Sequence, residues 1–204
     1  RRRNTRLHEK SRGLGDVYKR QTYTHYSGGG EVGGSVSANV MNRSHSITAQ
    51  VTIPEEGAEG VLLAQGGRFA GYSLYIKDNR LYYTHNYVGL REHVLESSIE
   101  IPSGETTLIY EFEVTGPPNF AEGKGAAGIG RLFMAGKKVA EGKLPVTTPI
   151  TFALSGEGLC CGWDSLSPAS SAYSGDFRFT GTIKRVDVTC GQAASKQPPS
   201  SPAD

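Results

Sequence analysis

Three histidines are the first residues whose chemistry could define a site. His45, His85 and His93 all lie in or beside segments with strand-like patterns. A zinc site needs three or four converging ligands, and these histidines lack the close spacing of such a set. Two acidic residues, Asp164 and Asp176, could instead offer oxygen ligands to calcium, as in some β-sandwiches. Structural or surface roles are favoured for all five residues, so we assign no metal-binding residue.

The three cysteines leave two alternatives open. Cys160 and Cys161 are adjacent and cannot easily bridge each other, because a disulfide requires specific geometry. Either one could pair with Cys190 if the protein is exported. Because any such pair leaves one cysteine over, three free thiols are the other alternative.

Aromatic side chains give a sharper hypothesis. Several could stack against sugar rings, with Arg68 and Lys77 meeting sulfate groups; they are Tyr72, Tyr75, Tyr82, Tyr83, Tyr87 and Trp163. Strand alternation places Tyr83 and Tyr87 on one face and Tyr82 on the other, so about half of them belong to the core. The favoured alternative is that the outward tyrosines pack against another domain. The residues predicted to contact a glycan or such a domain are Arg68, Tyr72, Asn86, Tyr87 and Trp163.

Strands must position these residues. Residues 60–87 read as three consecutive strands, over 61–64, 72–77 and 81–87. Asp78 and Asn79 suit a two-residue hairpin turn, because Asp and Asn tolerate left-handed backbone angles. Further strands are predicted at 45–53, 93–98, 106–114, 129–134, 137–141, 149–154 and 177–188, and residues 155–176 read as irregular.

About ten strands and no helical pattern predict an all-β fold, an antiparallel two-sheet sandwich or jelly roll. The sandwich is expected over residues 43–190, with 22–42 as a linker or lead-in strand. The Pro- and Ser-rich tail, 191–204, is predicted to be disordered. No apolar run is long enough to cross a bilayer, so no membrane contact is predicted.

Residues 1–21 differ from the rest in charge. They hold eight of the 22 Lys and Arg residues but two of the 20 Asp and Glu residues. The remaining residues therefore carry 14 Lys and Arg against 18 Asp and Glu, a net charge of −4. The run SRGLGDVYKRQ, residues 11–21, resembles a translated transposase-type sequencing adapter, and residues 1–6 resemble a translated flow-cell primer. We therefore expect residues 1–21 to be a disordered artefact and the natural polypeptide to begin upstream. Nucleic-acid binding is not predicted, because the basic charge lies in this segment.

Four blocks of the chain carry a resemblance to a known family. NRSHSITAQVTIP, GAEGVLLAQGGRFAGYSLYIKDNRLYYTHNYVGL, AGKKVAEGKL and FRFTGTIKRVDV resemble the C-terminal domain of bacterial arylsulfatases, which are type I sulfatases. The resemblance covers residues 22–190 and implies a concanavalin A-like, laminin-G-like sandwich that follows a catalytic domain. The chain departs from the family at 159–163, LCCGW, and its 115–128 loop is longer.

The resemblance implies a sulfuric-ester hydrolase as parent protein, but not an active fragment. Type I sulfatases use a formylglycine made from Cys or Ser in a Cys/Ser-x-Pro/Ala-x-Arg motif, together with a divalent cation, expected to be calcium. No cysteine or serine of this chain begins such a motif. We therefore predict no catalytic residue and no cofactor in this fragment, and the catalytic domain of the same polypeptide as its partner.

The leading hypothesis is an accessory sandwich that supports that catalytic domain and shapes its cleft through Arg68, Asn86, Tyr87 or the 159–173 loop. The alternative is an autonomous carbohydrate-binding module for sulfated glycans. A third hypothesis is a self-associating domain; the sequence leaves the oligomeric state open. The location favoured by the resemblance is the periplasm or the exterior of the cell.

Overall fold

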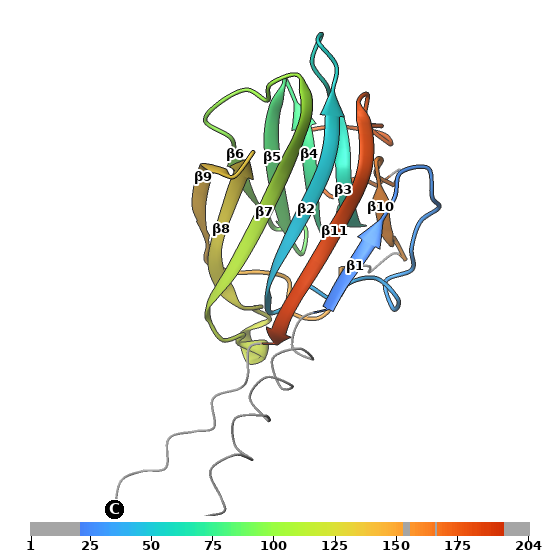
Figure 1. Cartoon of the computed structure of the whole chain (residues 1–204). Coiled ribbons are helices and arrows are strands. Elements are labelled where there is room, and N and C mark those ends of the chain that lie inside the picture. Colours follow the sequence, from blue (N-terminus) through green and yellow to red (C-terminus); the bar gives the residue numbers. More distant parts are fainter. Residues whose placement is uncertain (1–20, 153–155, 166, 194–204) are drawn as a thin grey trace, which may run out of the picture.

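The chain folds as an antiparallel β-sandwich (Figure 1). The computed structural model describes residues 21–152, 156–165 and 167–193. One sheet has six strands, in the order β1 (Gln21–His25), β11 (Thr182–Ala193), β2 (Arg43–Ile53), β7 (Gly104–Gly116), β8 (Ala127–Met134) and β9 (Lys137–Leu144). The other has five, in the order β10 (Leu159–Cys161), β3 (Gly60–Gly67), β4 (Ala70–Lys77), β5 (Arg80–Tyr87) and β6 (Arg91–Glu96). The predicted two-sheet sandwich is confirmed.

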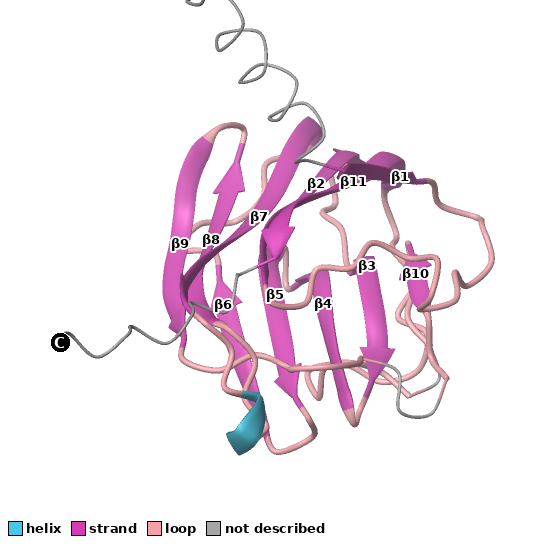
Figure 2. Cartoon of the chain, turned by 90° about the horizontal axis from the view of Figure 1, so that it is seen from below, coloured by secondary structure: helices cyan, strands magenta, loops and turns pink. Residues whose placement is uncertain are grey.

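Helix is almost absent from the described residues. A single 3₁₀ turn, η1 (Phe120–Glu122), interrupts the connection between β7 and β8 at one end of the sandwich (Figure 2). No helix in the described ranges has the length and apolar character that a bilayer crossing would need.

The core lies between the two sheets and follows the alternation of the strands. On β2, Ile47, Ala49 and Val51 point inward, and they are buried against side chains of the opposite sheet. The inward face of the five-stranded sheet contributes the large side chains of Leu62, Leu63, Tyr72, Leu74, Ile76, Leu81 and Tyr83. Because every second residue of these strands is apolar, folding removes a continuous apolar layer from water.

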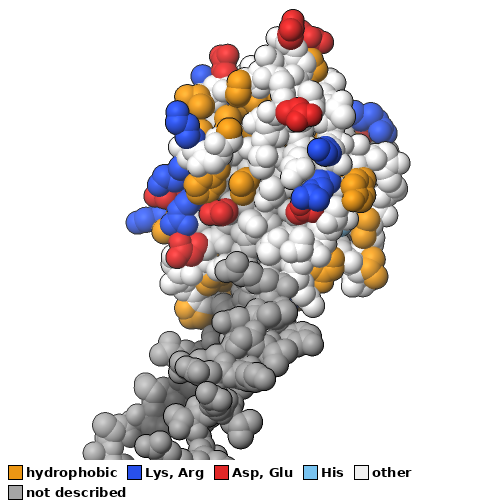
Figure 3. Space-filling model, in the orientation of Figure 1, with side chains coloured by type: hydrophobic (Ala, Val, Ile, Leu, Met, Phe, Trp, Pro, Cys, Tyr) orange, Lys and Arg blue, Asp and Glu red, His pale blue; other side chains and the backbone are white. Residues whose placement is uncertain are grey.

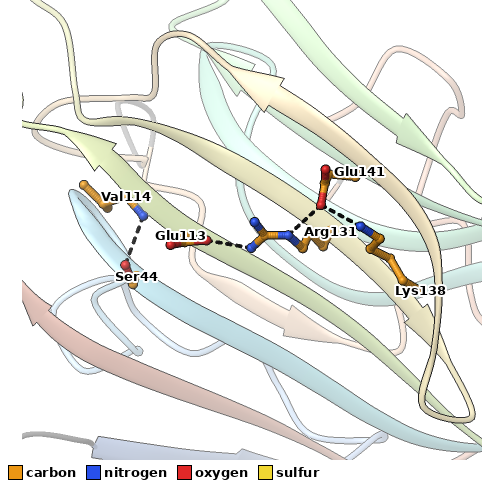
Figure 4. A network of polar contacts seen from close by, with 6 residues as sticks. All are labelled: Ser44, Glu113, Val114, Arg131, Lys138 and Glu141. Atoms are coloured by element: carbon orange, nitrogen blue, oxygen red, sulfur yellow. Dashed lines mark hydrogen bonds and ion pairs between the residues drawn. The ribbon is translucent and has the colours of Figure 1, made fainter.

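The outer face of the six-stranded sheet is polar. Acidic and basic side chains are interspersed on the side of the molecule seen in Figure 3. Arg131 on β8 bridges Glu113 on β7 and Glu141 on β9, each at 2.8 Å, and Lys138 also reaches Glu141, at 2.9 Å (Figure 4). These four charged groups neutralise one another across three strands.

The strands β3 and β4 of the five-stranded sheet are buried on both faces. All eight residues of β3 and seven of the eight in β4 are buried, which alternation alone does not explain. Residues 162–165 and 167–178, hereafter the covering segment, lie across the outer face of β3, β4 and β5 and shield it from water. Tyr75 therefore points away from the core yet is only 1% exposed.

The predicted hairpin turn at Asp78 and Asn79 is confirmed by its backbone angles, and a second hairpin has a turn of the same kind. Asp78 and Asn79 have φ of 48° and 56°, and they close the β4–β5 hairpin at the pair Lys77 and Arg80. Ala135 and Gly136, with φ of 46° and 80°, close the β8–β9 hairpin in the same way. Positive φ at both central positions matches the right-handed twist of the flanking strands.

Elsewhere the chain departs from the predicted strands. Residues 149–152 form no strand: Pro149 accepts a hydrogen bond from the side chain of Asn42, and Phe152 buries its ring in the core. Residues 153–154, the end of that predicted strand, lie outside the described residues. The stretch read as irregular contains β10, and β11 continues past 190 because a bulge lets Ala193 pair with Arg43.

Both ends of the chain are described only in part. Residues 1–20 of the adapter-like segment and residues 194–204 of the tail lie outside the described residues. Gln21 opens β1, which pairs along its length with β11. The stretch expected to be a linker or lead-in strand thus includes the edge strand of the six-stranded sheet.

Candidate functional site

The covering segment is fastened to the sheet by a buried acid. Asp164 is 1% exposed, and its carboxylate accepts hydrogen bonds from the backbone N–H of Ser165 (2.7 Å) and Ala169 (3.0 Å). The hydroxyl of Tyr173 donates to Asp164 Oδ2 at 2.6 Å and lies 2.7 Å from Ser73 Oγ on β4. Burial raises the pKa of Asp164, while these donors oppose that shift. The hydrogen bonds hold the carboxylate as an anchor, with little capacity left for a ligand.

Aromatic rings complete this attachment. Tyr75 stacks on Tyr82 at 5.3 Å between ring centroids, and it meets the edge of Tyr173 at 5.1 Å. Tyr173 in turn stacks on Phe177 at 4.9 Å. The interpretation that outward tyrosines pack on a separate domain is therefore wrong for Tyr75, because the chain's own covering segment buries it.

A hollow of about 400 Å³ opens where the covering segment meets the β3–β4 turn. It is lined by Arg68, Asn86, Glu92, Ser167, Pro168, Ser170, Ser171 and Tyr173, and we call it the Arg68 hollow. Arg68 and Phe69 form the turn itself, and both are exposed. The guanidinium carbon of Arg68 lies 5.5 Å from the centroid of the Phe69 ring. Charge and apolar surface are thus presented side by side at the rim.

Asn86 sets the shape of the rim. Its amide nitrogen donates to the carbonyl oxygens of Arg68 at 3.1 Å and Ala169 at 3.3 Å, and its Oδ1 accepts from the N–H of Gly89 at 2.9 Å. One buried side chain therefore joins the β3–β4 turn, the covering segment and the β5–β6 turn. Asn86 lies at the predicted site, but its polar groups are engaged within the protein, so it positions the hollow.

Glycines allow this close approach. A Cβ at Gly67 would lie 2.7 Å from the carbonyl oxygen of Ser167, and one at Gly71 would lie 3.1 Å from the Cβ of Ala169. A larger residue at Gly67 would push the covering segment outward, and one at Gly71 would also collide with Gln65 O, at 2.5 Å, in its own sheet. The sequence signal for this site is therefore a turn of Arg68 and Phe69 flanked by Gly66, Gly67 and Gly71.

Glu92 gives the hollow an acceptor beside the cation. Its carboxylate accepts from the backbone N–H of Ser171 at 2.8 Å and from the Ser171 hydroxyl at 3.0 Å. Arg68 pairs with no carboxylate in the described part of the chain, so its guanidinium keeps its donors. Sequence reasoning missed both Glu92 and Phe69. For Phe69, the flanking glycines were the available signal.

The other predicted contact residues lie elsewhere. Tyr72 is 0% exposed, and its hydroxyl donates to Gln65 Oε1 at 3.0 Å inside the core, so its prediction as a contact residue is wrong. It lies two and four residues before Leu74 and Ile76 on β4, so strand alternation places it on the same, inward face. Tyr87 is half-buried at the end of β5, and its hydroxyl donates to Gly123 O at 2.9 Å.

Trp163 lies in a second hollow. This hollow, about 370 Å³, is lined by Ser27, Gly28, Cys161, Gly162, Trp163, Arg178, Phe179, Gly181, Thr182 and Ile183. The structure thus brings Arg68 and Asn86 together but separates Trp163 from them. Lys77, expected near a sulfate, instead donates to Ala172 O at 2.8 Å.

Neither metal ligands nor disulfides emerge at the residues considered above. The described residues contain no group of three or more His, Cys, Asp or Glu arranged to hold a metal ion. Cys160, Cys161 and Cys190 are buried free thiols, and burial raises the pKa of Cys160 and Cys161 to about 12. Of the two alternatives for the cysteines, the structure has the free thiols.

Exposed apolar side chains gather at the end of the sandwich that carries the Arg68 hollow. β3, β5, β7 and β9 all run toward this end (Figure 1), and the loops after them expose Phe69, Leu90, Phe120 and Ile150. Hydrogen bonds link these loops: Thr148 Oγ1 donates to Asn86 O, and Gly125 N donates to Thr147 O. We call these four side chains the apolar end.

Comparison with known proteins defines the class of fold. No protein-family model matches the chain, and no curated protein sequence matches it. Among solved structures, the CBM40 domain of the Ruminococcus gnavus IT-sialidase is similar with a TM-score of 0.53 and 15% identity, over 85% of this chain and 94% of that one. The same domain bound to α2,3-sialyllactose gives a TM-score of 0.52 at 15% identity, over 81% and 90%.

A second kind of domain shares the architecture. Domains LG4–5 of the mouse laminin α1 chain match with a TM-score of 0.50 and 13% identity, over 82% of this chain and 40% of that one. The protein therefore has a jelly-roll β-sandwich of the kind seen in CBM40 and laminin G domains. At these identities the likeness establishes the fold alone, and function depends on the site.

Proposed function

We propose that this domain binds carbohydrate, with the Arg68 hollow as its site. The observation that carries the proposal is the pairing of an exposed ring and an unpaired guanidinium at the rim of a hydroxyl-lined recess. A sugar ring has an apolar face that suits stacking on Phe69, and hydroxyls that suit Glu92 and the serines of the covering segment. Recess and rim are fixed by Asn86, so little ordering is needed on binding.

The unpaired guanidinium of Arg68 favours an acidic sugar, whose anion would lie on the Arg68 side of the hollow, away from Glu92. A guanidinium binds carboxylate or sulfate oxygens through two parallel hydrogen bonds, which adds strength and orientation. Arg68 is free to do this, and the CBM40 domain was solved with sialyllactose, whose terminal sugar carries a carboxylate. Sulfated glycans offer the same chemistry, so both belong to the proposed ligand class.

Calorimetry with the whole chain tests the proposal. We expect saturable binding of 3′-sialyllactose or of sulfated oligosaccharides, and weaker binding of lactose. Arg68→Ala should weaken the affinity about tenfold or more, because a hydrogen bond to a charged group contributes about 1.5–3 kcal/mol. The matched control is Arg185→Ala, an exposed arginine of the six-stranded sheet. Absence of binding, or equal affinity of the Arg68 variant and the wild type, would contradict the proposal.

The apolar end supports a second candidate function, the accessory domain of an arylsulfatase-like protein. Leu90 and Ile150 are 80% and 72% exposed, and such side chains are suited to burial against another domain. The parent enzyme's formylglycine and cation would then belong to that other domain. The reading frame upstream in the source DNA tests this candidate: a Cys/Ser-x-Pro/Ala-x-Arg motif there would support it, and an unrelated domain would remove it.

A further inference from the structure

The second hollow, which we call the Trp163 hollow, lies where the open edges of the two sheets meet. Ser27 and Gly28 follow β1, Thr182 and Ile183 begin β11, and Cys161 ends β10. β1 and β10 lie on the same side of the sandwich (Figure 2). Its volume of about 370 Å³ falls within the range of roughly 300–1,000 Å³ typical of small-molecule sites.

Trp163 and Arg178 form the characteristic feature of this hollow. The guanidinium carbon of Arg178 lies 5.7 Å from the centroid of the indole ring. Arg178 Nε also pairs with Asp176 Oδ2 at 2.7 Å, although the side chains of these two residues are 69% and 47% exposed. The indole N–H of Trp163 donates to no residue in the described part of the chain. The hollow therefore combines an aromatic surface, a free donor and a cation.

The backbone beneath these side chains is held firmly although it forms no regular strand. Phe177 O accepts from the N–H of Val61 on β3 at 2.9 Å, and Gly162 O accepts from the N–H of Phe179 at 3.0 Å. Gly162 N in turn donates to Leu62 O at 3.1 Å. Phe177 has φ of 29°, an uncommon angle for a residue with a side chain, and such angles persist where surrounding contacts fix them. Both functional side chains are thus presented from a fixed frame.

The ion pair to Asp176 is well suited to exchange. An exposed ion pair contributes little free energy, because water screens it and two side chains must be ordered to make it. An anionic group of a ligand can replace the Asp176 carboxylate on the guanidinium and use both of its parallel donors. A polyanion such as nucleic acid is disfavoured, because residues 22–204 carry a balance of −4. A single anionic group on a ring with an apolar face fits both Arg178 and Trp163.

We propose that the Trp163 hollow is a second ligand site, which takes an acidic sugar, with Arg178 binding its sulfate or carboxylate and Trp163 contacting its ring. The site shares no lining residue with the Arg68 hollow and does not depend on it. Sulfated and carboxylated sugars would both offer Arg178 an anionic group. Titration with one sugar of each kind shows which of them the hollow binds.

Tryptophan fluorescence tests this site directly, because Trp163 is the only tryptophan in the chain. The whole chain is titrated with galactose 6-sulfate, with 3′-sialyllactose, with lactose and with sodium sulfate. We expect a saturable change in emission with one or both acidic sugars, and a weaker response to lactose and to sulfate alone. No change with either acidic sugar, or an equal response to lactose, would overturn the proposal.

Two variants locate the signal. Arg178→Ala should lower the affinity measured in the fluorescence titration about tenfold or more. Arg178→Lys should lower it too, because lysine keeps the charge but not the paired donors. Arg178 is exposed, so both variants should fold, which circular dichroism checks. If the Arg178→Ala variant titrates as the wild type does, the proposal is wrong.

Arg68→Ala separates the two sites. It should leave the fluorescence response intact while reducing the calorimetric stoichiometry from two sites to one. Loss of all heat with Arg68→Ala, with no fluorescence change in the wild type, would retain the Arg68 hollow and reject the Trp163 hollow. A fluorescence response that depends on Arg178, with no effect of Arg68→Ala on the heat of binding, would retain the Trp163 hollow and reject the Arg68 hollow.

Discussion

A buried histidine, His85, and a half-buried one with a buried ring nitrogen, His45, should make the stability of this domain depend strongly on pH. Thr148 N donates to His85 Nε2 at 3.0 Å inside the sandwich, so this nitrogen carries no proton. His45 donates from Nδ1 to Arg43 O at 2.8 Å, which leaves its buried Nε2 without a proton or a partner. Burial lowers the pKa of His85 from 6.5 to about 3 and that of His45 from 6.5 to about 4. Both are therefore neutral in the folded protein well below pH 6.

The sign and size of the effect follow from linkage. The folded-state pKa values lie below the unfolded value, so the unfolded chain binds protons first as the pH falls below about 6.5. The stabilisation is complete above that pH and is lost toward pH 4. Well below pH 6.5 each histidine changes the free energy of unfolding by about 1.4 kcal/mol per pH unit. The slope is half of that at pH 6.5 itself, so the combined loss between pH 6.5 and 5.0 is about 3 kcal/mol. The total free energy of unfolding of a native domain is only about 5–15 kcal/mol.

Other groups modify this slope without reversing it. His25 and His93 also have lowered pKa values, caused chiefly by burial, and they act in the same direction. The raised pKa of Asp164 acts in the opposite direction, because its protonated form is favoured in the folded state.

Urea denaturation at half-unit steps from pH 7.5 to 5.0 measures the effect. We expect a steep fall in the free energy of unfolding below pH 6.5. In His85→Gln the slope should decrease by about 1.4 kcal/mol per pH unit, because one titrating group is lost while an oxygen acceptor remains for Thr148. The half-buried His93 gives the matched variant, His93→Gln, with a smaller change. A flat profile, or an unchanged slope in His85→Gln, would refute the reasoning.

Three further results are expected. In Gly67→Ala the new Cβ would lie 2.7 Å from Ser167 O, so the covering segment should be displaced and glycan affinity in calorimetry should fall. The control Gly34→Ala, with open space around its Cβ, should bind with normal affinity. Tyr173→Phe should lower the free energy of unfolding, measured in urea, by about 1–3 kcal/mol, because the buried Asp164 carboxylate loses a donor. The control Tyr26→Phe, at an exposed position, should leave the free energy of unfolding unchanged. Equal stability of the two variants would contradict the anchor role of Asp164. A thiol reagent at pH 8 should find the cysteines unreactive in the native protein and all three reactive in urea, and fewer than three in urea would indicate a disulfide.

The sequence allowed prediction of the strands whose outer face meets water. β2 and β7 alternate apolar and polar residues because one side of each packs in the core and the other is solvated, so their faces were readable. The hairpin at Asp78 and Asn79 was readable because only a few residue types accept its backbone angles. For these elements, local physics and tertiary packing demand the same residues.

The candidate site was only partly predictable, because the covering segment has no local signature. Its conformation depends on one buried acid, Asp164, and on glycines in distant strands, and neither gives a periodic pattern. Tyr72 and Tyr75 have opposite orientations yet are both buried, so alternation could not tell which was available to a ligand. Arg68 and Asn86 were both predicted, and they lie together because the end of β5 is beside the β3–β4 turn.

The burial of Tyr75 changes how the two candidate functions compare. The accessory-domain hypothesis rests on the family resemblance, and packing of outward tyrosines on another domain was expected to accompany it; for Tyr75 the covering segment already supplies that contact. The apolar end stays available to a neighbouring domain, and its Phe69 lies beside Arg68, which lines the hollow. A domain that buries Phe69 would therefore close the hollow, and a glycan in the hollow would keep that domain away. Leu90 does not line the hollow, so Leu90→Ser should leave glycan affinity unchanged while weakening any domain contact at this end.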